Sequence, residues 1–195
     1  MIILANGDSP RVMLTAGVHG NEIPAQLAAM KLINYLNGKK LNGTVYIVPF
    51  LSPNGTSQTM RYWNDQNLNS IANKEGTPTN AIIKICEVTG IEKLGDFHST
   101  QPGGDPGNYS VLCSKSPEYE SYEMAEYISS ITNSSLKSYD VAGVDYVGAV
   151  EDVSNIHGIP AVTCEVLSPH GIATEETVNR SFDQMMAFLK YSKII

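Results

Sequence analysis

The chain has 195 residues, of which 42% are hydrophobic and 17% charged, and its net charge at pH 7 is -7. This composition is typical of a folded globular protein, and an acidic chain without a basic run is not suited to neutralising the phosphates of nucleic acid. No apolar run approaches the roughly 20 residues of a membrane span, and the amino terminus reads as a strand rather than a signal peptide, so we expect no membrane partner and a cytoplasmic location. The length suits one core, and we expect a single domain over residues 1–195.

The first half of the chain alternates strand-like and helix-like segments. After a short amino-terminal strand, residues 11–17 (RVMLTAG) predict a second strand that ends in small residues. Residues 22–36 predict a helix because apolar residues recur there at spacings of three and four. Residues 43–50 (GTVYIVPF) are typical of a strand covered on both faces. Residues 51–77 predict a long loop, and loops of this length usually carry function.

The second half continues the alternation. This pattern predicts a three-layer α/β/α sandwich around a mixed, largely parallel sheet. In such sheets, ligands bind at the carboxyl ends of the strands. The predicted elements are helices at residues 78–88, at residues 116–131 with Ser116 as the cap, and in a short segment ending near His157, strands at residues 91–98, 108–114, near 135–141 and 159–166, and a closing helix.

Three side chains that can bind a metal ion follow strand ends. His19 and Glu22 lie in the turn GVHGNE, and their spacing lets both bind one ion. His98 ends another predicted strand, and we expect it in a polar loop. Two imidazoles and a carboxylate leave a fourth position open for water on one Zn²⁺ ion, as in hydrolytic sites. From the spacing alone, hydrogen-bonded or surface histidines stay the alternative, because a lone HxxE pair is common.

Glu165 is the candidate general base. It lies near the end of an apolar strand, where a charge is costly unless it faces a cleft or a partner. A carboxylate in that position can take a proton from water activated by zinc. His170, five residues further on, is a weaker candidate to line the same cleft.

These segments resemble the zinc carboxypeptidase superfamily, including its succinylglutamate desuccinylase/aspartoacylase branch. Residues 17–22 (GVHGNE) are similar to the first zinc motif of that superfamily, and residues 96–100 (DFHST) to the motif of its third ligand. Residues 48–55 (VPFLSPNG) are similar to its NPxG turn after a central strand. The resemblance implies that His19, Glu22 and His98 bind one zinc ion.

The resemblance also implies roles for residues around the metal. Arg61, in TMRYW, matches the arginine that polarises the scissile carbonyl, and Glu165 matches the general base. Asn69 matches part of the group that holds a substrate carboxylate, and Tyr146 lies where the family places a mobile tyrosine. Ser99, next to a zinc ligand, is either a substrate contact or a hydrogen-bonding loop residue.

The chain departs from the family in residues 66–70, where QNLNS replaces DLNR. Asn67 replaces an aspartate that orients a zinc-bound histidine, and an uncharged amide should raise the basicity of that ligand less. We therefore expect weaker zinc binding. Ser70 replaces an arginine and cannot grip a carboxylate with two parallel hydrogen bonds. Ordinary carboxypeptidase specificity is therefore not expected.

We predict a zinc-dependent hydrolase that cleaves an amide bond of a small peptide or an N-acyl amino acid, with Glu165 assisting the attack of zinc-bound water. Carboxypeptidase and deacylase activity both stay open. The alternative is a catalytically silent zinc-binding or recognition module on the same fold, which Asn67 and Ser70 favour. The oligomeric state stays open.

Overall fold

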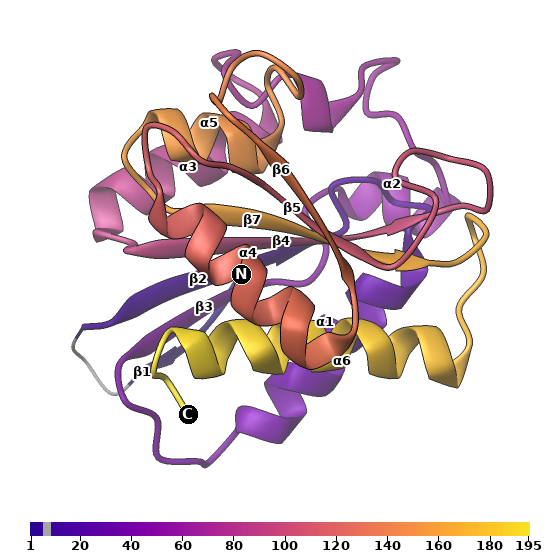
Figure 1. Ribbon diagram of the computed structural model, residues 1–195. Coiled ribbons are helices and arrows are strands. Elements are labelled where there is room, and N and C mark those ends of the chain that lie inside the picture. Colours follow the sequence, from indigo (N-terminus) through magenta and orange to yellow (C-terminus); the bar gives the residue numbers. More distant parts are fainter. Residues whose placement is uncertain (6–8) are drawn as a thin grey trace.

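The computed structural model describes residues 1–5 and 9–195 and contains a mixed sheet between two layers of helices (Figure 1). The strands are β1 (Ile2–Ala5), β2 (Arg11–Ala16), β3 (Thr44–Val48), β4 (Lys93–Thr100), β5 (Ser110–Ser114), β6 (Ser135–Tyr139) and β7 (Ala161–Leu167). The helices are α1 (Ile23–Leu36), α2 (Pro53–Gln58), α3 (Pro78–Thr89), α4 (Glu120–Thr132), α5 (Val150–Ile156) and α6 (Glu175–Tyr191), with a 3₁₀ helix η1 (Leu68–Ser70).

The seven strands form one sheet in the order β1-β3-β2-β4-β7-β5-β6. Four of the six pairings are parallel, and the pairings β1 with β3 and β5 with β7 are antiparallel. The prediction of a three-layer sandwich around a mixed, largely parallel sheet is confirmed.

The core consists of two apolar clusters, one on each face of the sheet. Helices α1, α4 and α6 cover one face of the sheet, and α3 and α5 cover the other (Figure 1). Leu14 and Phe97 belong to the cluster on the first face, whereas Met13 and Leu94 belong to the cluster on the second. Neighbouring strand residues therefore face opposite layers, and each fully buried large side chain contributes about 1.5–3 kcal/mol. No helix in the described part of the chain is long and apolar enough to cross a membrane.

Strand β4 corrects the prediction for His98. The strand continues to Thr100, two residues past its predicted end, and Ser99 and Thr100 pair with Val166 and Leu167 of β7. The polar residues that suggested a loop are therefore part of the ladder. His98 is not in a polar loop but in the sheet, with its side chain buried.

Two further boundaries differ from the prediction. The predicted loop at residues 51–77 contains α2 and η1, which are too short to show helical periodicity and consist mainly of residues common in turns. Helix α4 begins at Glu120 rather than at Ser116, and its N-cap residue, Tyr119, makes no side-chain capping bond.

A close backbone contact joins two of the sequence motifs. A Cβ atom on Gly20, in the turn after β2, would lie 2.0 Å from the carbonyl carbon of Gly55 in α2. Only glycine fits at such a distance from backbone atoms. The turn GVHGNE and the helix that follows β3 therefore pack directly against each other at the carboxyl ends of β2 and β3.

Candidate metal centre

The turn between β2 and α1 positions His19 and Glu22. Gly17 begins the turn with φ of 70°, a value that suits glycine. Gln26 of α1 then donates its side-chain amide toward the carbonyl oxygens of Gly20, at 3.1 Å, and Glu22, at 3.2 Å. Gln26 is buried, so these bonds hold the turn against the first turn of the helix. No sequence motif marks this residue.

The three predicted ligands converge on one point. Nδ1 of His19 lies 2.8 Å from Oε1 of Glu22, and Nδ1 of His98 lies 2.8 Å from Oε2 of the same carboxylate. One ligand atom from each of the three residues lies within 4.8 Å of the others, and all three side chains are buried. Two imidazole nitrogens and a carboxylate oxygen in this arrangement can hold a metal ion, and they are the ligand types that zinc prefers.

The other ring nitrogen of His19 is held by Asn67. Nε2 of His19 lies 2.7 Å from Oδ1 of Asn67, and the same oxygen accepts a hydrogen bond from the backbone N–H of Asn69. The bond from Asn69 identifies this atom as the amide oxygen of Asn67, and an amide oxygen can only accept. Nε2 of His19 is therefore the donor in its bond to Asn67. In the neutral imidazole the lone pair is then on Nδ1, the nitrogen that faces Glu22.

Asp96 holds the second ring nitrogen of His98, as Asn67 does for His19. Its Oδ2 lies 2.8 Å from Nε2 of His98, and its Oδ1 accepts the hydroxyl of Thr15 at 2.6 Å. Thr15 and Asp96 are register partners of β2 and β4, so the strand pairing places them side by side. Asp96 was not among the predicted site residues, although residues two apart in a strand share a face.

Burial and the neighbouring charges shift the pKa values of Glu22 and His98 in opposite directions. Burial alone would raise the pKa of Glu22, but the neighbouring His19 and His98 lower this pKa well below its ordinary value. Burial alone would lower the pKa of His98, but Asp96 and Glu22 raise it well above its ordinary value. Glu22 is therefore a carboxylate that faces an imidazolium, and a metal ion binding here would displace the Nδ1 proton of His98.

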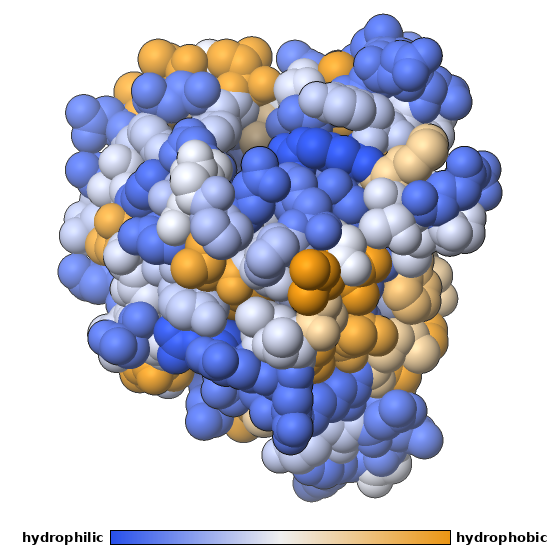
Figure 2. Space-filling view, turned by 90° about the vertical axis from the view of Figure 1, so that its right-hand side faces the viewer, coloured by the Kyte–Doolittle hydropathy of each residue, from blue (hydrophilic) through white to orange (hydrophobic). Residues whose placement is uncertain are grey.

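A cavity of about 350 Å³ lies over this cluster, and we call it the main cavity. Its lining includes Glu22, Arg61, Ser99, Glu165 and His170. It lies on the face at which the parallel strands end, where hydrophilic residues cover much of the centre (Figure 2). The location agrees with the expectation for ligand sites in α/β sheets.

Glu165 lies beside the metal ligands because of the strand register. It pairs with His98 across β7 and β4, so both side chains leave the sheet on the same face. Its Oε2 atom is buried and has no hydrogen-bond partner among the described residues. Burial, with a further contribution from the Glu22 carboxylate, raises the pKa of Glu165 to about 8.

Arg61 contacts the cluster directly. Its Nη1 donates to Oε1 of Glu22 at 2.6 Å, and its side chain is 33% exposed at the cavity. One end of the guanidinium is therefore bound to a candidate metal ligand, while the group as a whole still borders the main cavity.

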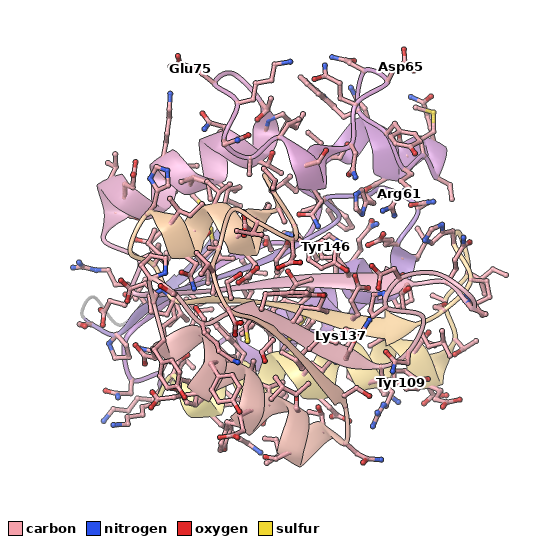
Figure 3. The ribbon with its side chains drawn as sticks, turned by 45° about the horizontal axis from the view of Figure 1, so that its top comes forward. Arg61, Asp65, Glu75, Tyr109, Lys137 and Tyr146 are labelled. Atoms are coloured by element: carbon pink, nitrogen blue, oxygen red, sulfur yellow. The ribbon has the colours of Figure 1, made fainter. Side chains whose placement is uncertain are left out.

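The remaining predicted residues surround the same region. The backbone N–H of Ser99 donates to Glu22 at 3.2 Å, and its buried hydroxyl has no hydrogen-bond partner in residues 1–5 and 9–195. Oδ1 of Asn69 accepts from the backbone N–H of Val150, and the Tyr146 hydroxyl donates to Asp105 at 2.5 Å. Figure 3 shows Arg61 and Tyr146 near the same end of the sheet, although they come from separate segments.

Asn69 and Tyr146 line a second, smaller cavity that also contains Glu165 and two carboxyl groups absent from the sequence analysis, Glu151 and Asp105. No motif includes either residue, so only their positions in the fold reveal them. His170, the weaker candidate, lines the main cavity in a loop held by a hydrogen bond from Gly171 to Asn21. The structure thus brings every predicted site residue to one end of the sheet.

About half of the chain matches a known family model. Residues 8–103, just under half of the chain, match the family model of the succinylglutamate desuccinylase/aspartoacylase catalytic domain. No curated protein sequence matches the chain.

Several solved structures share the fold at low sequence identity. The product-bound ectoine utilization protein EutE (DoeB) from Ruegeria pomeroyi has a TM-score of 0.80 at 17% identity, over 99% of this chain and 60% of its own. A succinylglutamate desuccinylase/aspartoacylase from Rhodobacter sphaeroides has a TM-score of 0.76 at 18% identity, over 99% and 58%. The mDAP-bound form of Csd4, a D,L-carboxypeptidase from Helicobacter pylori, has a TM-score of 0.73 at 14% identity, over 100% and 55%.

The predicted resemblance is confirmed by these matches, since they fall in the desuccinylase/aspartoacylase and carboxypeptidase groups. At these identities the solved structures establish the shared fold. The chain spans 60% or less of the length of the three solved structures.

Proposed function

We propose that residues 1–195 act as a zinc-dependent hydrolase domain that cleaves an amide bond of a small peptide or an N-acyl amino acid. One observation carries the proposal. Two imidazole nitrogens and a carboxylate converge within 4.8 Å beneath a cavity in which Glu165 presents a buried, unpartnered oxygen. A metal site beside a free carboxylate contains the groups that metal-assisted hydrolysis requires.

The ligand set fits one Zn²⁺ ion, held by His19, Glu22 and His98. When bound, zinc lowers the pKa of water to about 7 and polarises a carbonyl oxygen. Asn67 and Asp96 hold the Nε2 protons of the two histidines, so both rings keep Nδ1 directed at the ion. We expect weaker support from Asn67 than from Asp96, because the amide carries no charge.

Glu165 acts as the general base and then as the acid. Its free Oε2 takes a proton from the attacking water, and the same carboxyl group then delivers a proton to the nitrogen of the leaving amine. A raised pKa suits this double role because the proton must be accepted and released near neutral pH.

Arg61 stabilises the negative charge that develops on the carbonyl oxygen. Its contact with Glu22 uses Nη1, and a guanidinium has further N–H donors that remain for substrate. Removing a donor of this kind elsewhere typically costs about 10²- to 10³-fold in turnover. Ser99 adds a buried hydroxyl that can contact the substrate on the same side.

The size of the main cavity supports a small substrate. Its volume of about 350 Å³ is at the lower end of the roughly 300–1,000 Å³ of small-molecule sites. The solved structures with this fold include a desuccinylase/aspartoacylase and a carboxypeptidase. The test therefore includes both N-acyl amino acids and peptides.

The test combines metal analysis with a substrate panel. The purified protein is assayed for bound zinc and then for hydrolysis of N-acetyl amino acids, N-succinyl amino acids and dipeptides, with added zinc and with chelator. We expect about one zinc ion per chain and turnover that the chelator abolishes. A protein that takes up no zinc at micromolar supply contradicts the metal site.

A catalytically silent zinc-binding module is the second candidate. The observation that favours it is Ser70, whose hydroxyl donates to the backbone carbonyl of Asn67 at 2.9 Å within its own turn. The residue at this position therefore offers no substrate clamp. Zinc binding without hydrolysis of any panel member would favour this module over the enzyme.

A further inference from the structure

The loop after β7 presents a histidine at the main cavity to which the proposed function assigns no role. The imidazole of His170 is half-buried and lines this cavity together with Arg61 and Tyr62. In the described part of the chain, no residue forms a hydrogen bond with either of its ring nitrogens. Both nitrogens are therefore free for a molecule in the cavity, and a neutral imidazole offers a donor on one nitrogen and an acceptor on the other.

Backbone hydrogen bonds hold this loop on both sides. The backbone N–H of Ser168 donates to the carbonyl oxygen of Thr100 at 2.9 Å, and that of Gly171 donates to the carbonyl oxygen of Asn21 at 2.7 Å. The side chain of Ser168 is buried, and its hydroxyl donates to the carbonyl oxygen of Ile172 at 2.8 Å. A fixed backbone therefore carries the imidazole between the end of β4 and the turn of the metal ligands.

The same loop contacts the segment that carries Arg61. A Cβ atom on Gly171, whose φ is 76°, would lie 3.1 Å from Cγ2 of Thr59, two residues before Arg61. A further cavity of about 370 Å³ shares Arg61 and Tyr62 with the main cavity, so the two adjoin. The space beside His170 therefore continues past Arg61 and has room for several atoms of a substrate.

The charges near His170 indicate on which side of the site it lies. The charged groups that shift its pKa are Glu22, Arg61 and His19, and Glu165 is not among them. The smaller cavity, which Glu165 lines, does not include His170 either. In the proposed function Arg61 contacts the carbonyl oxygen and Glu165 delivers a proton to the leaving amine. His170 therefore faces the acyl group rather than the leaving group.

The hydrogen-bonding capacity of His170 limits the groups that it can recognise. An imidazole with the ordinary pKa of about 6.5 is already mainly neutral at pH 7.5. Burial lowers the pKa of His170 further, Arg61 and His19 act in the same direction, and Glu22 opposes them. A neutral imidazole can pair with a hydroxyl or an amide, but it lacks the charge that strengthens a bond to a carboxylate.

We propose that His170 is a specificity-determining residue that forms a hydrogen bond with the acyl group of the substrate. The preferred acyl groups then carry a neutral polar group, a hydroxyl or an amide, on a short arm beyond the scissile carbonyl. The proposal rests on the proposed hydrolase function, because that function places the carbonyl oxygen at Arg61 and the leaving amine at Glu165.

The test compares isosteric acyl groups on the amino acid that the substrate panel favours, with zinc-loaded protein at pH 7.5. The pairs are glycoloyl with propanoyl, 3-hydroxypropanoyl with butanoyl, and 4-hydroxybutanoyl with pentanoyl, and succinyl serves as the acidic acyl group. In at least one pair we expect the hydroxyl to lower KM by about three- to tenfold at similar kcat, as for one neutral hydrogen bond. Equal KM values in every pair, or a lower KM for succinyl than for every hydroxyl-bearing group, would overturn the proposal.

Variants of His170 connect the preference to this residue. His170→Leu should remove the preference, while His170→Gln, which keeps a donor and an acceptor, should retain part of it. His157→Leu, the same change at an exposed histidine after α5, is the matched control and should leave the preference as in the wild type. Thermal unfolding establishes that each variant is folded. A preference that survives in His170→Leu, or a loss of zinc from that variant, contradicts the assignment.

A binding measurement separates this proposal from the proposed function. The free acids of the three pairs are titrated into zinc-loaded wild type and His170→Leu, and NMR follows the ring signals of His170, which are identified by their absence from the variant. We expect one hydroxy acid to shift these signals and to bind about three- to tenfold tighter than its isostere, a difference lost in His170→Leu.

The two proposals fail in different ways. If no amide is cleaved, the hydrolase function fails, but the difference in binding still supports the role of His170. Equal affinities within every pair overturn that role whatever the activity. A difference that persists in His170→Leu also overturns it, because it would show that the hydroxyl contacts the metal ion or another residue.

Discussion

The two halves of the candidate site differ in how fully their polar atoms are hydrogen-bonded. The metal-binding half consists of His19, Glu22 and His98 with their supports Asn67 and Asp96. Nε2 of each imidazole has a hydrogen-bond partner in this half, and both oxygens of Glu22 accept, Oε1 from Arg61 and Oε2 from His98 and the backbone N–H of Ser99. The substrate half consists of the Ser99 and Glu165 side chains with the two cavities, and here the buried oxygens of both side chains have no hydrogen-bond partner in the part of the chain that the structure describes.

This difference indicates which part of the site is prepared in advance. His19 and Glu22 lie in a turn that Gln26 holds by hydrogen bonds, and His98 lies in a strand. These side chains keep their orientation without a bound ion, so binding of an ion would require little rearrangement. The unpartnered oxygens of the substrate half are costly until a ligand supplies hydrogen-bond donors. In the proposed function, the metal-binding half would therefore determine whether an ion binds, and the substrate half would determine which amide is cleaved.

The largest expected effect is the loss of turnover in Glu165→Gln, which changes the substrate half and leaves the metal ligands in place. The variant keeps the shape of the side chain but cannot take a proton, so turnover should fall by about 10²- to 10⁴-fold. Zinc content should stay at the wild-type level because Glu165 is not a ligand. Metal analysis and kcat are measured side by side, with Glu126→Gln, an exposed change on α4, as control. Full turnover in Glu165→Gln would exclude this residue as the base.

Asp96→Asn tests the metal-binding half alone. Removing the charge behind His98 should weaken zinc affinity by about 10- to 100-fold, because such supports raise the basicity of the ligand. Competition with a chromophoric chelator measures the affinity. Asp183→Asn, an exposed change on α6, is the matched control. An unchanged affinity in Asp96→Asn would show that the hydrogen bond to His98 does not tune the metal.

Asn67→Asp should act in the opposite direction on the same half. A carboxylate accepting from Nε2 of His19 would raise the basicity of Nδ1, so we expect zinc affinity to increase by about tenfold. The same chelator competition applies, and the double variant with Asp96→Asn shows whether the two supports act independently. Weaker zinc binding in Asn67→Asp would contradict the role given to this amide.

The last prediction concerns the substrate half and the stability of the zinc-free protein. Burial raises the pKa of Glu151 to about 8 in the folded chain, from an ordinary value of 4.5. The folded state therefore holds this proton more tightly than the unfolded state, and the resulting stabilisation is complete below about pH 4.5 and lost as pH rises through 8.

The free energy of unfolding should thus fall by about 3–4 kcal/mol more in wild type than in Glu151→Gln between pH 5 and pH 8. Urea unfolding of both proteins across this range measures the difference. Parallel curves for the two proteins would show that Glu151 titrates alike in the folded and unfolded chains.

Much of the fold and of the metal-binding half could be predicted from local patterns. Apolar runs and helical spacing identified the main strands and helices, because those patterns depend on neighbours a few residues apart. The spacing of His19 and Glu22 is likewise local. The sequence did not reveal α2, because a single short turn of polar residues has no period to detect.

The rest depended on contacts between distant segments. Asp96 lies two residues before His98 in the same strand, so its position on the same face is visible in the sequence. Its hydrogen bond to Thr15, in contrast, depends on the register of β2 against β4. Glu165 could be proposed from its costly position in an apolar strand, yet its place beside His98 follows from the pairing of β4 with β7.

The sequence by itself thus determined the class of fold, the identity of the three candidate ligands and the candidate base. Only the tertiary structure decided that Glu151 and Glu165 line one cavity and that Lys137 balances Asp105. The physical reason is that residue type and spacing act along the chain, whereas the charge that surrounds a cavity depends on strand order and register.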